Sequence, residues 1–324
     1  MKIVIMDGSA ANPGDLSWDI LNRFGDVTVY DVTPPELVYE RASGAQIILT
    51  NKTVFDAEML SRLPDVKYIG VLATGYNVVD IPYCKEHGIV VTNVPAYSTY
   101  ATAQMTVALI LEFCDKVGLH NEAVMKGEWI SSPQFCFFKA PIIELWNLRA
   151  HIIGFGKIGM RVAAILSSLG MKVSATPHHF TPGETYTLPD GEVVEFMDVA
   201  EGLREADIVS LHAPLTDETH WIINSSSIAG MKDGALLVNC ARGPLVNEDD
   251  VVSALKSGKL GGYCADVISK EPMEASNPLF GAPNTILTPH IAWAAGETRR
   301  RLLEIAAGNI EAFLAGSPIN NVVK

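Results

Sequence analysis

Three ionisable residues in the second half of the chain, Arg242, Glu271 and His290, each lie close behind a short apolar run that is typical of a buried strand. A guanidinium can bind a carboxylate through two donors and polarise the carbonyl beside it. An imidazolium can protonate the oxygen that becomes a hydroxyl, and a nearby carboxylate favours that protonated form. Taken singly, each residue is more often structural, as a core histidine or one member of an ion pair. Together at neighbouring strand ends, they predict a catalytic set that reduces a 2-keto acid.

A glycine pattern precedes these residues in the chain. The run Gly154-Phe155-Gly156-Lys157-Ile158-Gly159 follows an apolar strand and opens a helical segment, which is the context of a dinucleotide-binding turn. Gly154 would allow the tight turn, Gly156 would let the backbone approach the pyrophosphate, and Gly159 would let helix and strand pack closely. The amides at the start of the helix would face the anion. The alternative is a strand-to-helix turn that holds no ligand.

The end of the next strand often decides between the two nicotinamide dinucleotides, because an acid there binds the ribose hydroxyls and an arginine accommodates a 2′-phosphate. Here the strand ends Val173-Ser174-Ala175-Thr176-Pro177-His178-His179, without either residue type. His178 and His179 could touch the ribose or a 2′-phosphate, although exposed loop histidines are more often inert. With Pro177 where the acid is expected, this position leaves NAD and NADP both open.

Alternating strand and helix patterns must position these residues. Over the first hundred residues, β-rich apolar runs alternate with helical patterns, and a second such series begins at His151. The alternation predicts two doubly wound α/β units, each a parallel sheet with helices on both faces, with an active-site cleft between them. Strands are expected at 3–6, 27–30, 47–49, 68–72, 89–91, 152–153, 172–175, 208–211, 236–239, 262–265 and 285–288.

Two long helical patterns define the expected domains. One runs from Ser98 to Lys126 and suits a helix that crosses between the domains. The other runs from Gly296 to Phe313 and is expected to pack back on the first domain. We therefore predict a discontinuous substrate-binding domain at 1–98 and 294–324, and a dinucleotide-binding Rossmann domain at 99–293.

Composition narrows the class of protein. The chain has 324 residues, a hydrophobic fraction of 48% and a formal net charge of -13. The length fits two cores, and the negative charge disfavours nucleic acid and anionic lipid as partners. The five cysteines contain no C-x-x-C pair, so no metal site or redox pair is expected. No apolar stretch approaches the ~18 residues needed to span a bilayer. We expect a cytoplasmic protein that acts on a small molecule.

Seven segments resemble, in the same order, the D-isomer-specific 2-hydroxyacid dehydrogenase family and its hydroxypyruvate reductase (glycerate dehydrogenase) branch. They cover nearly the whole chain and are Ala73–Asp80, Thr92–Pro95, Gly154–Gly159, His212–Thr216, Asn239–Gly243, Asp266–Pro272 and Thr288–Trp293. The resemblance implies that Arg242 binds the substrate, that His290 is the acid/base, and that Glu271 pairs with His290.

The resemblance also implies roles that spacing alone does not single out. Backbone amides at Thr74 and Gly75 would hold the substrate carboxylate, and Trp293 would lie beside the substrate. Asp266 would hydrogen-bond the nicotinamide carboxamide. NAD(H) is the favoured cofactor, with NADP(H) left open. Further cofactor contacts are expected at Gly154, Gly156, Lys157, Ile158, Gly159, Thr106, Pro214, Thr219 and Cys240.

Two residues depart from the family pattern just before the glycine turn. Asn147 stands in the lead into the strand, where it can adopt the left-handed turn that a glycine would supply. His151 replaces a small residue at the start of the strand and is expected to alter packing beneath the turn. Neither change removes a catalytic group.

Three functions remain open, and the first is preferred. They are a reductase of hydroxypyruvate or glyoxylate, a dinucleotide-sensing interaction protein like the corepressors that share this fold, and a D-lactate dehydrogenase. The second is disfavoured because long disordered or motif-bearing termini are lacking. A homodimer is expected, with the long helix from Ser98 as the contact. The sequence does not rank small 2-keto acids, because that choice depends on pocket volume.

Overall fold

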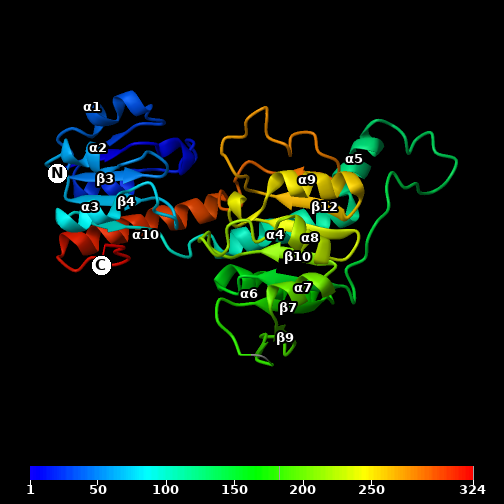
Figure 1. The fold of residues 1–324 in the computed structure, drawn as a ribbon. Helices are drawn as coiled ribbons and strands as arrows, with labels where there is room; N and C mark the ends of the chain where they lie inside the picture. Colours follow the sequence, from blue (N-terminus) through cyan, green and yellow to red (C-terminus); the bar gives the residue numbers. More distant parts are fainter. Residues whose placement is uncertain (182, 324) are drawn as a thin grey trace. The chain divides into compact units, whose positions relative to one another are not determined.

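The computed structural model describes residues 1–181 and 183–323. They form two compact units, one of Met1–Ser98 with Trp293–Lys324 and the other of Thr99–Ala292. Each unit is built on its own, mainly parallel sheet (Figure 1). The predicted α/β fold class is therefore confirmed.

The first unit contains five parallel strands in the order β2-β1-β3-β4-β5. Strands β3 and β4 are buried along their whole length, which explains why they read as continuous apolar runs. The strands are β1 Lys2–Ile5, β2 Asp26–Val29, β3 Ile47–Thr50, β4 Tyr68–Val71 and β5 Val90–Thr92.

Hydrophobic clusters cover both faces of this sheet. Val4 belongs to one cluster and Ile3 and Ile5 to the other, as the two-residue period of a strand requires. Helices α1, α2 and α3 contribute to the first cluster, and α10 contributes to the second. These helices are α1 Val38–Ala42, α2 Ala57–Ser61, α3 Ile81–Glu86 and α10 Gly296–Leu314.

The second unit contains an eight-stranded sheet in the order β13-β12-β11-β10-β6-β7-β9-β8. Strands β8 and β9 pair antiparallel at one edge, whereas the other neighbours are parallel. Strand β6 lies between β7 and β10, so the strand order reverses beside it. The strands are β6 Arg149–Ile153, β7 Lys172–Thr176, β8 Thr185–Thr187, β9 Val193–Phe196, β10 Ile208–Leu211, β11 Ala235–Asn239, β12 Leu260–Ala265 and β13 Thr285–Leu287.

Helices cover both faces of the second sheet (Figure 1). Helices α4 and α6 pack on one face, and α7, α8 and α9 pack on the other. The helices of this unit are α4 Thr99–Asp115, α5 Val117–Met125, α6 Lys157–Ser168, α7 Val199–Glu205, α8 Ser225–Gly230 and α9 Glu248–Ser257. Short 3-10 helices lie in the first unit at η1 Gly8–Ala10, η2 Asp19–Phe24 and η3 Pro35–Leu37, and in the second unit at η4 Gly243–Leu245.

Two local features differ from the sequence-based expectation. The single helix predicted from Ser98 to Lys126 is wrong, because Lys116 has a left-handed φ of 53° and separates α4 from α5. The sequence pattern also does not predict the β8–β9 hairpin. Strand β8 is exposed at every residue, so it lacks the apolar run by which buried strands are recognised.

The five cysteines are free thiols. Cys84, Cys114, Cys240 and Cys264 are buried, and Cys136 is partly exposed.

Among the described helices, none combines the length and apolar character needed to cross a membrane.

Candidate active site

The carboxyl ends of the strands of the second sheet carry most of the predicted site residues. Gly154 follows β6, Arg242 follows β11, Asp266 follows β12 and His290 lies beyond β13. In an open parallel sheet, ligands bind at this edge, beside the point where the strand order reverses. The fold therefore brings the glycine turn and the ionisable residues to one edge of one sheet.

The glycine turn has little room for side chains at two of its three glycines. Gly154 has a left-handed φ of 94°, and a Cβ there would lie 2.4 Å from the backbone nitrogen of Ala213. A Cβ on Gly159 would lie 2.2 Å from the carbonyl oxygen of Gly154. A Cβ on Gly156 would meet no atom within 4 Å. Gly156 therefore keeps the backbone accessible, whereas the other two glycines permit the turn and its packing.

The start of α6 fits an anionic group. Gly156 caps this 12-residue helix without a side-chain hydrogen bond, and no acid lies in its first turn. The amides of Lys157 and Ile158 are thus among those left without a partner inside the helix, at the positive end of its dipole. Together with the space over Gly156, they can hold the pyrophosphate of a dinucleotide.

Asn239 orients the loop that carries Arg242. It is fully buried at the end of β11, its amide donates to the Arg242 carbonyl at 2.9 Å, and its oxygen accepts the Ala241 N–H at 3.0 Å. The Arg242 guanidinium is exposed and donates to the Ala241 carbonyl at 2.7 Å. It pairs with no carboxylate of residues 1–181 and 183–323. Its charge can therefore serve an anionic ligand.

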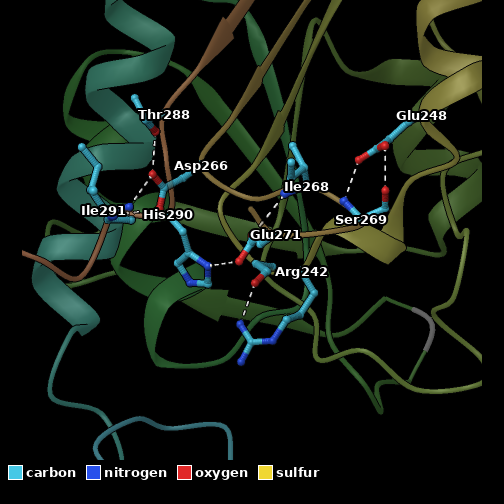
Figure 2. Close-up of polar contacts among 11 residues, drawn as sticks. Arg242, Glu248, Asp266, Ile268, Ser269, Glu271, Thr288, His290 and Ile291 are labelled. Atoms are coloured by element: carbon cyan, nitrogen blue, oxygen red, sulfur yellow. Dashed lines mark hydrogen bonds and ion pairs between the residues drawn. The ribbon is translucent and has the colours of Figure 1, made fainter. Parts of the chain in front are cut away.

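His290 and Glu271 form a hydrogen-bonded pair at the same edge (Figure 2). Glu271 Oε2 accepts from His290 Nδ1 at 2.6 Å, and Glu271 Oε1 accepts from the Ile268 N–H at 3.3 Å. The imidazole and carboxylate side chains are 30% and 33% exposed. With Nδ1 directed at the carboxylate, Nε2 forms no hydrogen bond to a described residue. The ring can therefore offer Nε2 to a ligand.

Asp266 holds the loop that carries His290. Its Oδ1 accepts the Thr288 hydroxyl and the Ile291 N–H, the latter at 2.9 Å, and Oδ2 accepts the Ala292 N–H at 2.7 Å. His290 has a left-handed φ of 55°, which is strained for a residue with a side chain. The buried Asp266 carboxylate thus stabilises an unfavourable backbone conformation. Its predicted hydrogen bond to the nicotinamide carboxamide stays a prediction.

The remaining predicted cofactor residues lie in the same unit. Thr106 is buried on α4 and donates its hydroxyl to the Thr102 carbonyl at 2.9 Å. Burial raises the pKa of the Cys240 thiol to about 12, which keeps it neutral. Thr219 donates to the Pro214 carbonyl at 2.7 Å and so closes the loop after β10. Contact of these four residues with a cofactor remains a prediction.

Thr74, Gly75 and Trp293 belong to the first unit. Thr74 follows β4, is exposed, and donates its hydroxyl to the Val94 carbonyl at 3.1 Å. Trp293 is partly buried and meets Tyr97 edge-to-face, with ring centroids 6.3 Å apart. The predicted role of these three residues in substrate binding stays a proposal.

His151 supports the end of β7 from within the sheet. It is fully buried, with Nδ1 2.9 Å from Ser174 Oγ and Nε2 3.0 Å from Thr176 Oγ1. The Thr176 hydroxyl donates to the Met197 carbonyl at 2.8 Å, so Nε2–H donates to Thr176 and Nδ1 accepts from Ser174. Burial lowers the pKa of His151 to about 4, so the ring is neutral. This departure from the family pattern is thus the centre of a buried polar network.

Pro177, His178 and His179, which directly follow β7, supply no carboxylate for a ribose and no arginine or lysine for a 2′-phosphate. His178 and His179 are exposed, their ring centroids lie 4.0 Å apart, and neither forms a hydrogen bond to a described residue. Pro177 supplies no polar side chain.

Sequence reasoning missed the residues that hold the site loops in place. The sequence singles out Asn239 only as part of the Asn239–Gly243 segment. Glu248 is one of three consecutive acids at the start of a helix, so its function could not be told from theirs. Such residues act on backbone amides and not on a ligand. Their signal in one sequence is therefore limited to a polar residue beside a functional loop.

A comparison with protein-family models agrees with this geometry. Residues 107–292, more than half of the chain, match the model described as D-isomer specific 2-hydroxyacid dehydrogenase, NAD binding domain. The chain belongs to this family of D-isomer-specific 2-hydroxyacid dehydrogenases. The matched region includes the glycine turn and all three predicted catalytic residues. A nicotinamide dinucleotide is therefore the cofactor that the second unit fits.

Full-length relatives and solved structures agree. The chain is 46% identical over 327 residues to a hydroxypyruvate reductase of Blautia hydrogenotrophica, covering 100% of both chains. It is 37% identical to a glycerate dehydrogenase of Methylorubrum extorquens, covering 99% of this chain and 98% of that protein. The crystal structure of D-lactate dehydrogenase from Aquifex aeolicus, complexed with NAD and lactic acid, matches with a TM-score of 0.84 and 28% identity, covering 100% of this chain and 99% of that one.

Proposed function

We propose that this D-2-hydroxyacid dehydrogenase is a hydroxypyruvate and glyoxylate reductase, which in reverse is a glycerate dehydrogenase. The observation that carries the proposal is the 2.6 Å hydrogen bond between His290 and Glu271, at the same sheet edge as the guanidinium of Arg242, which pairs with no described carboxylate. The substrate class is supported by the names of the two full-length relatives.

Substrate binding is assigned to Arg242 and to the backbone of Thr74 and Gly75. The guanidinium would bind the carboxylate and polarise the neighbouring keto group. Asn239 fixes the Arg242 backbone on both sides, which reduces the freedom lost when substrate binds. Trp293 is assigned a substrate contact as well.

Proton transfer is assigned to His290. A nicotinamide dinucleotide held at Gly156, Lys157 and Ile158 would supply the hydride for the keto carbon. Nε2–H of the imidazolium gives its proton to the carbonyl oxygen, which becomes the hydroxyl, and the ring regains a proton from solvent. Glu271 favours the imidazolium before transfer and fixes the ring through Nδ1.

A substrate panel tests the proposal. We expect the enzyme to oxidise NADH fastest with hydroxypyruvate, more slowly with glyoxylate and slowest with pyruvate. Arg242→Ala should raise KM for every keto acid, and Arg204→Ala, which removes an exposed arginine elsewhere in the same unit, should not. Faster turnover of pyruvate would favour a D-lactate dehydrogenase. Tight dinucleotide binding without turnover of any keto acid would favour the sensor function.

We propose NAD(H) as the preferred cofactor. The loop between β7 and β8 contains no arginine or lysine for a 2′-phosphate, and its ionisable side chains, His178, His179 and Glu184, are exposed. Kinetics with NADH and NADPH at pH 6 and pH 8 test this preference. If the histidines bind a 2′-phosphate, NADPH will gain on NADH as the pH falls, and His178→Ala with His179→Ala will abolish that gain.

We also propose a homodimer whose contact is the apolar arm, defined as residues 126–146. The arm projects from the second unit beyond α5 (Figure 1). Its exposed side chains include Ile130 at 92%, Phe135 at 89% and Phe138 at 73%. Helix α4, in contrast, buries most of its apolar residues within its own unit, although Tyr100 is 66% exposed. In a two-fold symmetric dimer, the arm of each copy would pack against the second unit of the other copy. This contact would remove the apolar surface of the arm from water.

Light scattering tests the dimer. The double variant Phe135→Glu, Phe138→Glu should be monomeric, whereas Ile319→Glu, at a side chain 52% exposed in the first unit, should remain dimeric. A wild-type monomer, or a dimer that survives the arm substitutions, would contradict the assignment.

A further inference from the structure

A buried glutamate lies behind the loop that carries Glu271. Glu248, the first residue of α9, is 8% exposed. Its Oε1 accepts the Ser269 N–H at 2.6 Å, and its Oε2 accepts the Ser269 hydroxyl at 2.7 Å and the Asn277 amide at 2.9 Å (Figure 2 shows the Ser269 contacts). None of the ion pairs among the described residues includes Glu248. The carboxylate is therefore held entirely by the segment 269–277.

The backbone around Glu248 is in close contact with the same segment. A Cβ on Gly243 would lie 1.9 Å from the carbonyl carbon and oxygen of Ile268 and 2.4 Å from the Ser269 nitrogen. Only a glycine allows the Arg242 loop to approach the start of the segment so closely. The loops that carry Arg242 and Glu271 are thus packed backbone against backbone, with Glu248 bound across their junction.

The segment between Ser269 and Asn277 lies at the surface. Residues 269–276 are exposed, and the next buried apolar residue is Leu279. Within the segment, Lys270 pairs with Glu274 on the surface, where such pairs contribute little. Glu248 contacts both ends, at Ser269 and at Asn277. Its hydrogen bonds therefore hold both ends of the segment that carries Glu271, whose own carboxylate contacts the Ile268 N–H and His290.

We propose that Glu248 is a positioning residue for the acid-base pair. By holding Ser269 and Asn277, it keeps the Glu271 carboxylate within hydrogen-bond distance of His290 Nδ1. The kinetic consequences of this inference rest on the proposed reductase function. Its structural consequences rest on the hydrogen bonds alone. Arg242 and Asp266 lie on the neighbouring loops (Figure 2), and the test leaves both unchanged.

The test compares Glu248→Gln with Asp249→Asn, which changes an exposed acid in the same helical turn. An amide in place of the carboxylate keeps the shape but directs a donor at the donors of Ser269 or Asn277. We expect kcat for hydroxypyruvate to fall about tenfold, the loss typical of one hydrogen bond to a charged group, with KM changed much less. The alkaline limb of the pH–rate profile should move to lower pH. Asp249→Asn should match wild type.

A double variant tests whether Glu248 acts through Glu271 or only stabilises the fold. If Glu248 acts through Glu271, the double variant Glu248→Gln, Glu271→Gln should be no slower than Glu271→Gln alone. Losses that add, or a kcat and pH profile of Glu248→Gln that match wild type, would overturn the proposal. If Glu248→Gln does not fold, Asn277→Ala removes one partner at the surface and should cause a smaller loss of the same kind. A normal kcat and pH profile in Asn277→Ala would then overturn the proposal.

Histidine NMR keeps this test independent of the reductase assignment. With labelled histidines and the enzyme saturated with NAD, we expect His290 to be less protonated at a fixed pH in Glu248→Gln than in wild type, as in Glu271→Gln. An unchanged His290 signal would refute the positioning function even if the enzyme reduces hydroxypyruvate. A changed signal in an enzyme that reduces no keto acid would uphold it while refuting the proposed reaction.

Discussion

The buried His151 makes stability depend on pH in a calculable way. Burial lowers the pKa of His151 from 6.5 to about 4 in the folded chain, whereas the unfolded chain binds a proton near the ordinary value. The stabilisation from the neutral ring is complete above about pH 6.5 and is lost as the pH falls toward about 4. The unfolded state binds the proton first, so acid favours unfolding.

The size of the effect follows from the two pKa values. Over the whole window, a shift from 6.5 to about 4 corresponds to a loss of about 3 kcal/mol. Between pH 7 and pH 5, the same linkage predicts a loss of about 2 kcal/mol. His212 contributes in the same direction, because burial lowers its pKa to about 4 as well.

Urea denaturation at pH 7 and pH 5 measures this loss when wild type is compared with His151→Gln. The variant cannot take up the proton, and it retains His212 and the carboxylates, so its stability should fall about 2 kcal/mol less than that of wild type between the two pH values. Equal pH dependence in the two proteins would refute the assignment of a neutral, buried His151.

Further substitutions test the other parts of the site. Gly154→Ala should weaken dinucleotide binding at least tenfold by calorimetry, because the left-handed turn leaves no space for a Cβ, whereas Gly156→Ala should perturb binding without loss of the fold. Asn239→Ala should raise KM for hydroxypyruvate about tenfold with kcat less affected, and an unchanged KM would contradict its function in holding Arg242. Asp266→Asn should lower kcat about 100-fold because the His290 loop opens; a loss confined to dinucleotide affinity would instead favour the carboxamide contact.

Much of the fold could be predicted from sequence because its strands are buried. Runs such as Ile208–Leu211 are wholly inside, so their apolar character marks them directly. The break at Lys116 could not be predicted, because the residues on either side of it keep helical patterns. Strand β8 could not be predicted for the opposite reason: its threonines and tyrosine are exposed, and it is held by pairing with β9 and by the ring contact of Tyr186 with Phe155.

Part of the candidate site could likewise be predicted from sequence motifs, and the rest depends on tertiary contacts. Gly154, Arg242 and His290 could be predicted because their chemistry and their position after strands are local properties. The functions of Asn239, Glu248 and Asp266 depend on which backbone amides lie beside their side chains. Those distances arise only when loops far apart in sequence meet, as Gly243 and Ile268 do.

The most direct test of the central claim is the rate of hydride transfer to hydroxypyruvate by His290→Ala, with NADH binding measured in the same preparation. The exposed-histidine variant His220→Ala serves as the control. If His290 delivers the proton, kcat will fall about 100- to 10,000-fold while NADH binds as in wild type and the control remains active. Hydride transfer by His290→Ala at close to the wild-type rate would contradict the account.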